Sequence, residues 1–323
     1  MNPILLLSHQ KKKAYLSIEN ALKSGKLQIS VPLLLPMQEL AEVYKLVIGN
    51  NPDLLYADPV ELKAFIVGVT KILECKAVIQ LSNYKHFKYT LEKEVSRVYE
   101  KYIKHKETEV QKILAIHDYL INSVVYNNRE PIALKYNYFA HNAYGALVNK
   151  KAVCDGIACA FQALANKAGI NSSIIFGDAG GEKHAWNIVE IDGDNYHIDV
   201  TWDLKNTEID GFNRYDYFCV TDENMSNRTW NKSLYSPCKN LRYNYFKLMD
   251  SIAYSEMDLK RIIKKQLLKH KKAYLKFEGK YEGDFQSYVL NVSREICEKN
   301  NLDYYQVNVF YNEDQKAVII ITE

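Results

Sequence analysis

Three residues with the chemistry of an activated nucleophile follow one another along the chain: Cys154, His184 and Asp199. A thiol can attack a carbonyl carbon, an imidazole can take the thiol proton, and a carboxylate can orient the imidazole. Each residue lies in a short motif, and the motifs are Ala152-Val-Cys-Asp-Gly156, His184-Ala-Trp-Asn187 and His197-Ile-Asp-Val-Thr-Trp-Asp203. If the three side chains meet in space, the sequence predicts attack by sulfur on a carbonyl group.

The first motif predicts that Cys154 lies at the start of a helix. Apolar residues recur at helical spacing as far as Leu164, and Ala168-Gly169 is a typical helix end. Backbone N–H groups and the positive end of the helix dipole favour a thiolate at this position, and the same groups can hold an oxyanion. The charge of Asp155 opposes the thiolate, so an imidazolium partner must outweigh it. Gly156 is expected to leave room for a substrate backbone.

The other two motifs predict a β-hairpin. Alternation of apolar residues indicates strands over 184–191 and 194–200, joined by the two-residue turn Asp192-Gly193. A strand over 172–176 and a flexible loop over 178–183 are expected before it.

The hairpin register predicts which side chains share a face. It places Trp186 opposite Asp199 and His184 opposite Thr201, so that all four project on the same side. His184 and Asp199 are then diagonal neighbours, with Cβ atoms roughly 7–8 Å apart. That separation suits a hydrogen bond between imidazole and carboxylate. His197 is expected beside this site, nearer the turn.

At these motifs the chain resembles the transglutaminase-like superfamily of papain-type thiol enzymes, and Asn142-Ala-Tyr-Gly-Ala-Leu147 resembles its bacterial members. The resemblance covers about residues 105–220. It implies an α+β fold whose papain-like core packs the nucleophile helix on an antiparallel sheet that carries the histidine and the aspartate. The chain departs from the animal cross-linking enzymes, because Val153 and Asp155 flank the cysteine where those enzymes have Gln and Trp. No acidic cluster resembles their calcium sites.

The expected chemistry is thiol-dependent acyl transfer from an amide or its hydrolysis, by a protease, amidase or transglutaminase, through a thioester intermediate. The substrate would be a protein or peptide, attacked at a glutamine side chain or a backbone amide. Substrate-binding residues are predicted at Trp186, Trp202, Tyr144 and Gly156. The two indoles would form apolar walls, and Tyr144 is a candidate second oxyanion donor. The alternative is a catalytically silent module of this fold that binds peptide or cell-wall ligands.

The remaining sequence predicts an N-terminal α/β region over 1–90, the catalytic domain over 91–250 and a small C-terminal α+β domain over 251–323. Helices are expected at 12–23, 37–48, 91–102, 107–125, 141–148, 154–168, 256–272 and 285–299. Further strands are expected at 64–72, 75–81, 273–277, 304–311 and 317–322, and a loop at 127–138.

Composition narrows the function classes. The chain has 323 residues, 47% hydrophobic and 25% charged, with a net charge of +3. This balance argues against nucleic acid or an anionic membrane as partner, and no apolar run reaches the ~20 residues needed to span a bilayer.

The six cysteines lack the spacing of a disulfide framework or a zinc finger, so free thiols, no metal and no cofactor are expected. Lys11–Lys13 follow the first apolar run, unlike a secretion signal, and a cytoplasmic protein is expected. Oligomeric state stays open.

Overall fold

The protein is described by a computed structural model that covers residues 3–127, 138–205, 212–302, 304 and 306–322. The chain divides into two compact units, one formed by residues 1–214 with 228–239 and the other by 215–227 with 240–323. Both units combine helices with strands, so the predicted α+β class is confirmed. The three-part division at residues 90 and 250 stays a prediction. Among the described residues, every helix is too short or too polar to cross a bilayer.

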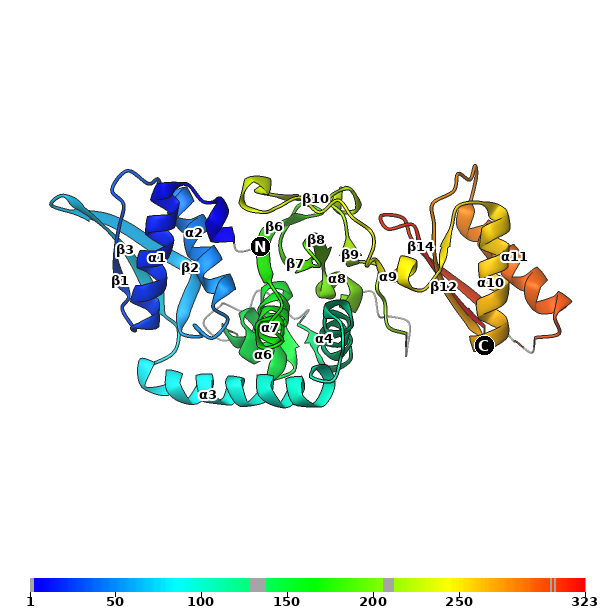
Figure 1. Ribbon diagram of the computed structural model, residues 1–323, viewed down its shortest axis with the longest axis horizontal. Helices are drawn as coiled ribbons and strands as arrows, with labels where there is room; N and C mark the ends of the chain where they lie inside the picture. Colours follow the sequence, from blue (N-terminus) through cyan, green and yellow to red (C-terminus); the bar gives the residue numbers. More distant parts are fainter. Residues whose placement is uncertain (1–2, 128–137, 206–211, 303, 305, 323) are drawn as a thin grey trace. The chain divides into compact units, whose positions relative to one another are not determined.

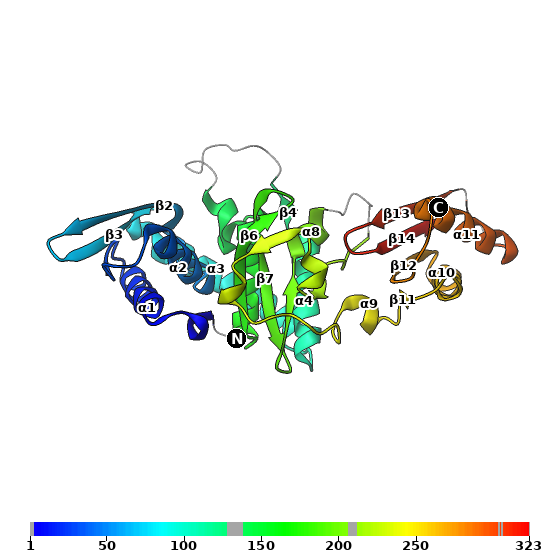
Figure 2. The same cartoon turned by 90° about the horizontal axis from the view of Figure 1, so that it is seen from above.

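The first unit begins with two helices beside a small antiparallel sheet. The 3-10 turn η1 (Pro3–Leu6) precedes α1 (His9–Lys23) and α2 (Met37–Asn50), and the strands are β1 (Gln28–Val31), β2 (Ala57–Val67) and β3 (Thr70–Ala77), in the order β1-β3-β2. The predicted strand over 64–72 is wrong, because Gly68 adopts a φ of +60° and turns the chain there. Figure 2 shows the resulting β2–β3 hairpin projecting beyond α1 and α2.

A group of helices then surrounds the cysteine helix α7 (Cys154–Lys167). They are α3 (Leu81–Val98) with its π-helical extension η2 (Tyr99–Ile103), α4 (Glu109–Ser123), the 3-10 turn η3 (Tyr138–His141) and α6 (Ala143–Leu147). A capping box of Thr108 and Gln111 starts α4. In Figure 1, α3 runs past the ends of α6, α7 and α4. Most of the predicted loop over 127–138 lies outside the described residues.

The helix α7 packs on a sheet that contains β10 (Arg228–Trp230), β6 (Ser172–Ala179), β7 (Glu182–Ile191) and β8 (Asp194–Ile198), in that order. The predicted loop over 178–183 is instead a tight turn at Gly180-Gly181, because β6 and β7 stay paired as far as Ala179 and Glu182. The Asn187 amide in β7 donates a hydrogen bond to the Ala158 carbonyl in α7 at 3.1 Å. This bond ties the cysteine helix to the central strand.

The predicted hairpin forms with the expected turn, since Ile191 pairs with Asp194 and Asn187 with Ile198. The second strand ends sooner than expected, because Val200–Lys205 forms the helix α8. Thr201 therefore belongs to a helix, and its predicted pairing with His184 is wrong. Asp199 lies between the strand and the helix, where the backbone changes direction.

Two short strands, β4 (Val125–Tyr126) and β5 (Lys151–Ala152), form a parallel pair, and β5 lies directly before the cysteine helix. The 3-10 turn η5 (Lys232–Leu234) completes the first unit.

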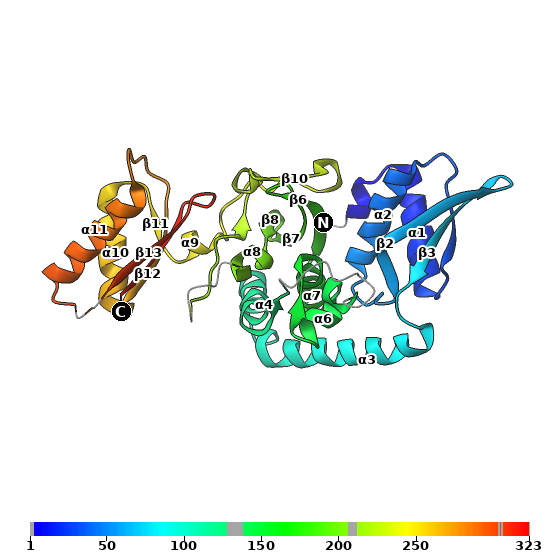
Figure 3. The same ribbon diagram turned by 180° about the vertical axis from the view of Figure 1, so that it is seen from behind.

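In the second unit, β11 (Ile252–Ala253), β12 (Lys272–Phe277), β14 (Ala317–Thr322) and β13 (Val307–Asn312) form a sheet in that order. It also contains β9 (Phe218–Val220), the 3-10 turn η4 (Glu223–Met225) and α9 (Tyr245–Leu248). Its main helices, α10 (Glu256–His270) and α11 (Phe285–Lys299), are drawn beside the sheet in Figure 3. They share one apolar core with it.

Candidate active site

Cys154 is the first residue of α7, as the sequence predicts. Val153 before it is extended, and its side chain makes no capping hydrogen bond. The Cys154 N–H therefore lacks the acceptor that a residue four positions earlier would supply inside a helix. The thiol is partly exposed, whereas the other five cysteines are buried. Cys154 thus combines access from solvent with a position at the positive end of a helix dipole.

The structure brings Cys154, His184 and Asp199 together. Nε2 of His184 lies 2.8 Å from Oδ2 of Asp199, and Cys154 lies close enough to the same imidazole to contribute to its raised pKa. Because Nε2 is engaged by the carboxylate, Nδ1 is the ring nitrogen left for the thiol. His184 is 7% exposed and Asp199 is 1% exposed. The arrangement has the order of nucleophile, base and orienting acid that thiol catalysis requires.

The pKa values of the imidazole and the carboxylate move in opposite directions. Burial by itself lowers the pKa of His184, but the charge and hydrogen bond of Asp199 and the contact with Cys154 outweigh it and raise this pKa to about 9. Burial raises the pKa of Asp199, while His184 and Arg228 lower it by more, to about 2. The site is therefore arranged to hold a protonated imidazole against an ionised carboxylate across the neutral pH range.

Arg228 is a member of this cluster that the sequence analysis missed. Its NH2 group donates to Oδ2 of Asp199 at 2.9 Å, and both side chains are fully buried. The guanidinium lies 4.6 Å from the centre of the Trp202 ring, and the backbone N–H of Trp202 donates to Oδ1 of Asp199 at 3.2 Å. Both carboxylate oxygens are thus occupied. Arg228 comes 29 residues after Asp199, and its sequence context has no feature that distinguishes it from the other arginines.

Asp155, whose charge opposes a neighbouring thiolate, is itself held by a histidine. Nδ1 of His141 lies 2.8 Å from one Asp155 oxygen and 3.0 Å from the other, and the Gly156 N–H donates to the same carboxylate at 2.9 Å. These donors offset part of the charge that the sequence analysis expected the imidazolium to overcome. A further unpredicted neighbour is Tyr126, the phenol of which has a pKa raised by burial and then by the nearby charges of Cys154 and Asp155.

Gly156 has a structural role that differs from the predicted one. A Cβ atom at this position would lie 2.2 Å from the carbonyl oxygen of Ala140, which accepts the Val153 N–H at 3.0 Å. The absent side chain therefore makes room for the protein's own backbone in η3. That Gly156 also accommodates a substrate backbone stays a prediction.

Replacing Gly156 with alanine should consequently destabilise the fold by roughly 1–3 kcal/mol or more, because backbone must move to relieve the clash. Gly49→Ala is the matched control, since Gly49 is also helical and its Cβ would meet only side-chain carbon atoms, at 3.3 Å. Urea unfolding of the two variants measures the difference. Equal stability losses in both would contradict this role of Gly156.

The three aromatic residues predicted to bind substrate lie in different surroundings. Trp186 is 1% exposed and stacks on the His184 ring at 5.8 Å, so it supports the imidazole and is too buried to line a substrate path. Trp202 is half-buried, with its ring edge-on to His184 at 6.4 Å, and its role as a wall stays a prediction. Tyr144 packs on Phe139 at 4.7 Å and Phe87 at 5.3 Å, and its role as an oxyanion donor also stays a prediction.

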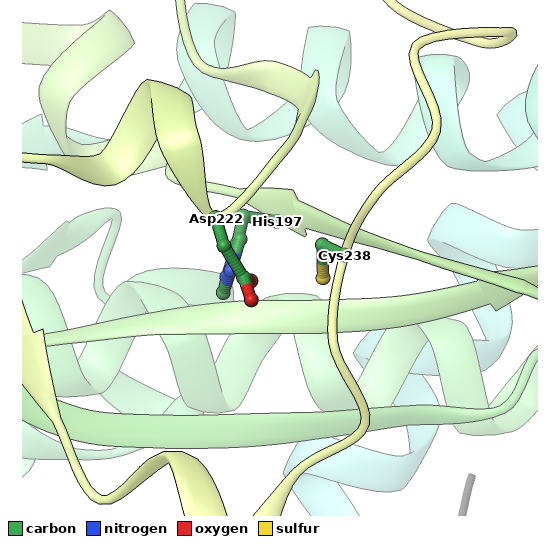
Figure 4. Close-up of side chains that lie close together, drawn as sticks. All are labelled: His197, Asp222 and Cys238. Carbon is green, nitrogen blue, oxygen red and sulfur yellow. The ribbon is translucent and has the colours of Figure 1, made fainter.

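His197 lies next to the site through Trp186, as expected. The Trp186 indole N–H donates to Nδ1 of His197 at 3.1 Å. A ring nitrogen of His197 and the sulfur of Cys238, both in the first unit, lie within 4.8 Å of one another (Figure 4). Asp222, which Figure 4 also draws, belongs to the second unit. Two donor atoms are fewer than the three or four protein ligands of a zinc site, so this pair by itself defines no metal centre.

Residues 96–200 match the sequence model of the transglutaminase-like superfamily. The chain therefore contains a transglutaminase-like superfamily domain, and the matched residues include Cys154, His184 and Asp199. The match agrees with the family resemblance read from the three motifs.

Solved structures that match this chain include one described as a TGase, with 17% identity and a TM-score of 0.30, over 48% of this chain and 46% of that one. A candidate cysteine protease from Cytophaga hutchinsonii has 17% identity and a TM-score of 0.29, over 44% and 62%. A candidate protease from Parabacteroides distasonis has 13% identity and a TM-score of 0.28, over 44% and 36%. The chain thus spans less than two thirds of each of these proteins. Comparison with curated proteins gives no match.

Proposed function

We propose that the protein is a thiol-dependent amidase, protease or transglutaminase that forms a thioester on Cys154. The observation that carries this proposal is the contact of Cys154 with His184, whose other ring nitrogen is held by the buried Asp199. Membership of the transglutaminase-like superfamily supports an enzymatic function in general. The subtype and the substrate, a protein or peptide amide, are part of the proposal.

In the first half-reaction the Cys154 thiolate attacks the amide carbonyl carbon, and the carbonyl oxygen takes the negative charge. The N–H of Cys154 at the start of α7 can donate to that oxygen. The C–N bond then breaks, and ammonia or an amine leaves with the proton from His184. The acyl group remains on sulfur as a thioester.

In the second half-reaction His184 accepts a proton from water or from an acceptor amine as it attacks the thioester. Asp199 keeps the imidazole oriented through Nε2 in both steps. Transfer to water gives an acid and restores the thiol, while transfer to an amine gives a new amide. Hydrolysis is the favoured outcome, because water needs no dedicated acceptor site.

Mass spectrometry of a broad peptide library tests the proposal, with incubations in the presence and absence of a primary amine. Side-chain deamidation, an amine adduct and a cleaved backbone give three different mass changes, and the wild-type protein should produce one of them. Cys154→Ala should produce none. Identical spectra for the two proteins would contradict an enzymatic function and favour a silent module that binds peptide or cell-wall ligands.

A further inference from the structure

The buried ion pair of Arg228 and Asp199 has a specific position relative to the nucleophile. Arg228 is the first residue of β10, which pairs with β6 at the edge of the sheet, and its side chain is fully buried. Oδ2 of Asp199 accepts from Arg228 at 2.9 Å and from His184 at 2.8 Å. One oxygen atom therefore joins the guanidinium to the imidazole that contacts Cys154.

The charges in this cluster balance only when Arg228 is counted. In the reactive state Cys154 and Asp199 carry one negative charge each, and His184 carries one positive charge. Burial of an unbalanced charge is costly, because water no longer solvates it. Without Arg228 the balanced state would be the neutral thiol beside the pair of His184 and Asp199. With Arg228 the balanced state contains the thiolate.

We propose that Arg228 is a positioning residue whose fixed charge and hydrogen bond to Asp199 hold Cys154 in its ionised, reactive state. Trp202 assists, because its ring lies against the guanidinium and its backbone N–H fixes the second oxygen of the carboxylate. The inference rests on the proposed function, since it assigns Arg228 a part in activating the same nucleophile.

Other titratable groups also face this cluster, and they must be considered in any pH profile. Asp155 on α7 lies beside the thiol and is paired with His141 from η3. The phenol of Tyr126 on β4 lies within electrostatic reach of Cys154, Asp155, Asp199 and the Glu182 carboxylate on β7. None of these groups contributes a permanent positive charge, whereas the guanidinium of Arg228 stays charged at every pH used for alkylation.

The test is the pH dependence of the rate at which iodoacetamide alkylates Cys154, followed by mass spectrometry of the Cys154 peptide. In Arg228→Gln, which keeps a hydrogen-bond donor but loses the charge, the rise in rate should move upward by roughly one pH unit or more. Arg228→Lys, which keeps the charge, should return the profile most of the way to wild type. A purely structural role predicts no such difference between the two variants.

Lys232→Met is the matched control, because Lys232 is an exposed cation 4.7 Å from the Trp230 ring and lies in the same segment. Its profile should coincide with that of the wild type. A folded Arg228→Gln protein with the wild-type profile, or an equal shift in Lys232→Met, would overturn the proposal. If Arg228→Gln does not fold, the pH profile of the wild-type protein decides. The alkylation rate of Cys154 must then rise at a pH below ~8.5, the ordinary pKa of a cysteine thiol. A rise at or above that pH overturns the proposal. Alkylation requires no substrate, so its outcome does not depend on turnover of the peptide library. A library without turnover would contradict the proposed function and would leave the alkylation result for Arg228 unchanged.

Discussion

Cys154→Ala should lose turnover of any peptide found to react by roughly 10⁴-fold or more, because it removes the sulfur atom that would carry the acyl group. The substitution removes only the sulfur, and alanine is a good first residue for a helix. We therefore expect the variant to fold with wild-type stability and still to bind substrate. Initial rates with the most reactive library peptide, measured beside an unfolding curve, give the answer.

Cys159→Ala is the control for this substitution. Cys159 lies on the same helix, but burial raises the pKa of its thiol and it has no contact with solvent that a nucleophile would need. The control should keep the wild-type rate per folded molecule. If Cys154→Ala retained more than a small fraction of the rate, or if both variants lost it equally, the thioester mechanism would not describe this protein.

Asp199→Asn should lower the rate by roughly 10³- to 10⁴-fold while leaving the shape of the side chain unchanged. Oδ2 of Asp199 accepts from both His184 and Arg228, and an amide cannot present a charged acceptor to both. The imidazole then loses the carboxylate that fixes its tautomer and raises its pKa to about 9. Rates measured from pH 5 to 9 should show the loss throughout that range.

The chain contains a closely matched control, because a second buried carboxylate pairs with a histidine in the same domain. Oδ2 of Asp203 lies 2.9 Å from Nε2 of His117, and both side chains are fully buried. Asp203→Asn therefore makes the same chemical change in a different pair of side chains. The Asp203 backbone N–H donates to the Asp199 carbonyl at 3.3 Å, and the substitution keeps this backbone bond. It should lower stability and keep most of the activity. Comparable rate losses in both variants would show that general disruption explains the effect of Asp199→Asn.

The sequence predicted the central geometry because the relevant signals are local. A cysteine before an apolar helical stripe determines where the thiol lies, and Asp192-Gly193 fixes the register of the hairpin. Those two features are enough to place Cys154, His184 and Asp199 in one domain with suitable directions. The helices α10 and α11 of the second unit were predicted for the same reason, since their caps and apolar periodicity lie within each segment.

The features that sequence reasoning missed depend on contacts between distant segments. Arg228 reaches Asp199 only because β10 returns to the edge of β6, and no local pattern indicates that pairing. The role of Gly156 depends on the carbonyl of Ala140 in a separate turn. The early end of β8 also has a tertiary cause, because the helix after Asp199 packs against α4 and α7 and overrides the alternation that continues to Val200.

Selective alkylation of the six thiols near pH 7 is the most direct test of whether His184 activates Cys154. In the wild-type protein iodoacetamide should label Cys154 far faster than the other five thiols, which are buried. In His184→Ala that preference should fall sharply, although the exposure of the sulfur does not decrease. Slow and uniform labelling of the wild type, or a Cys154 rate unchanged by His184→Ala, would contradict the activated thiolate on which the proposed chemistry depends.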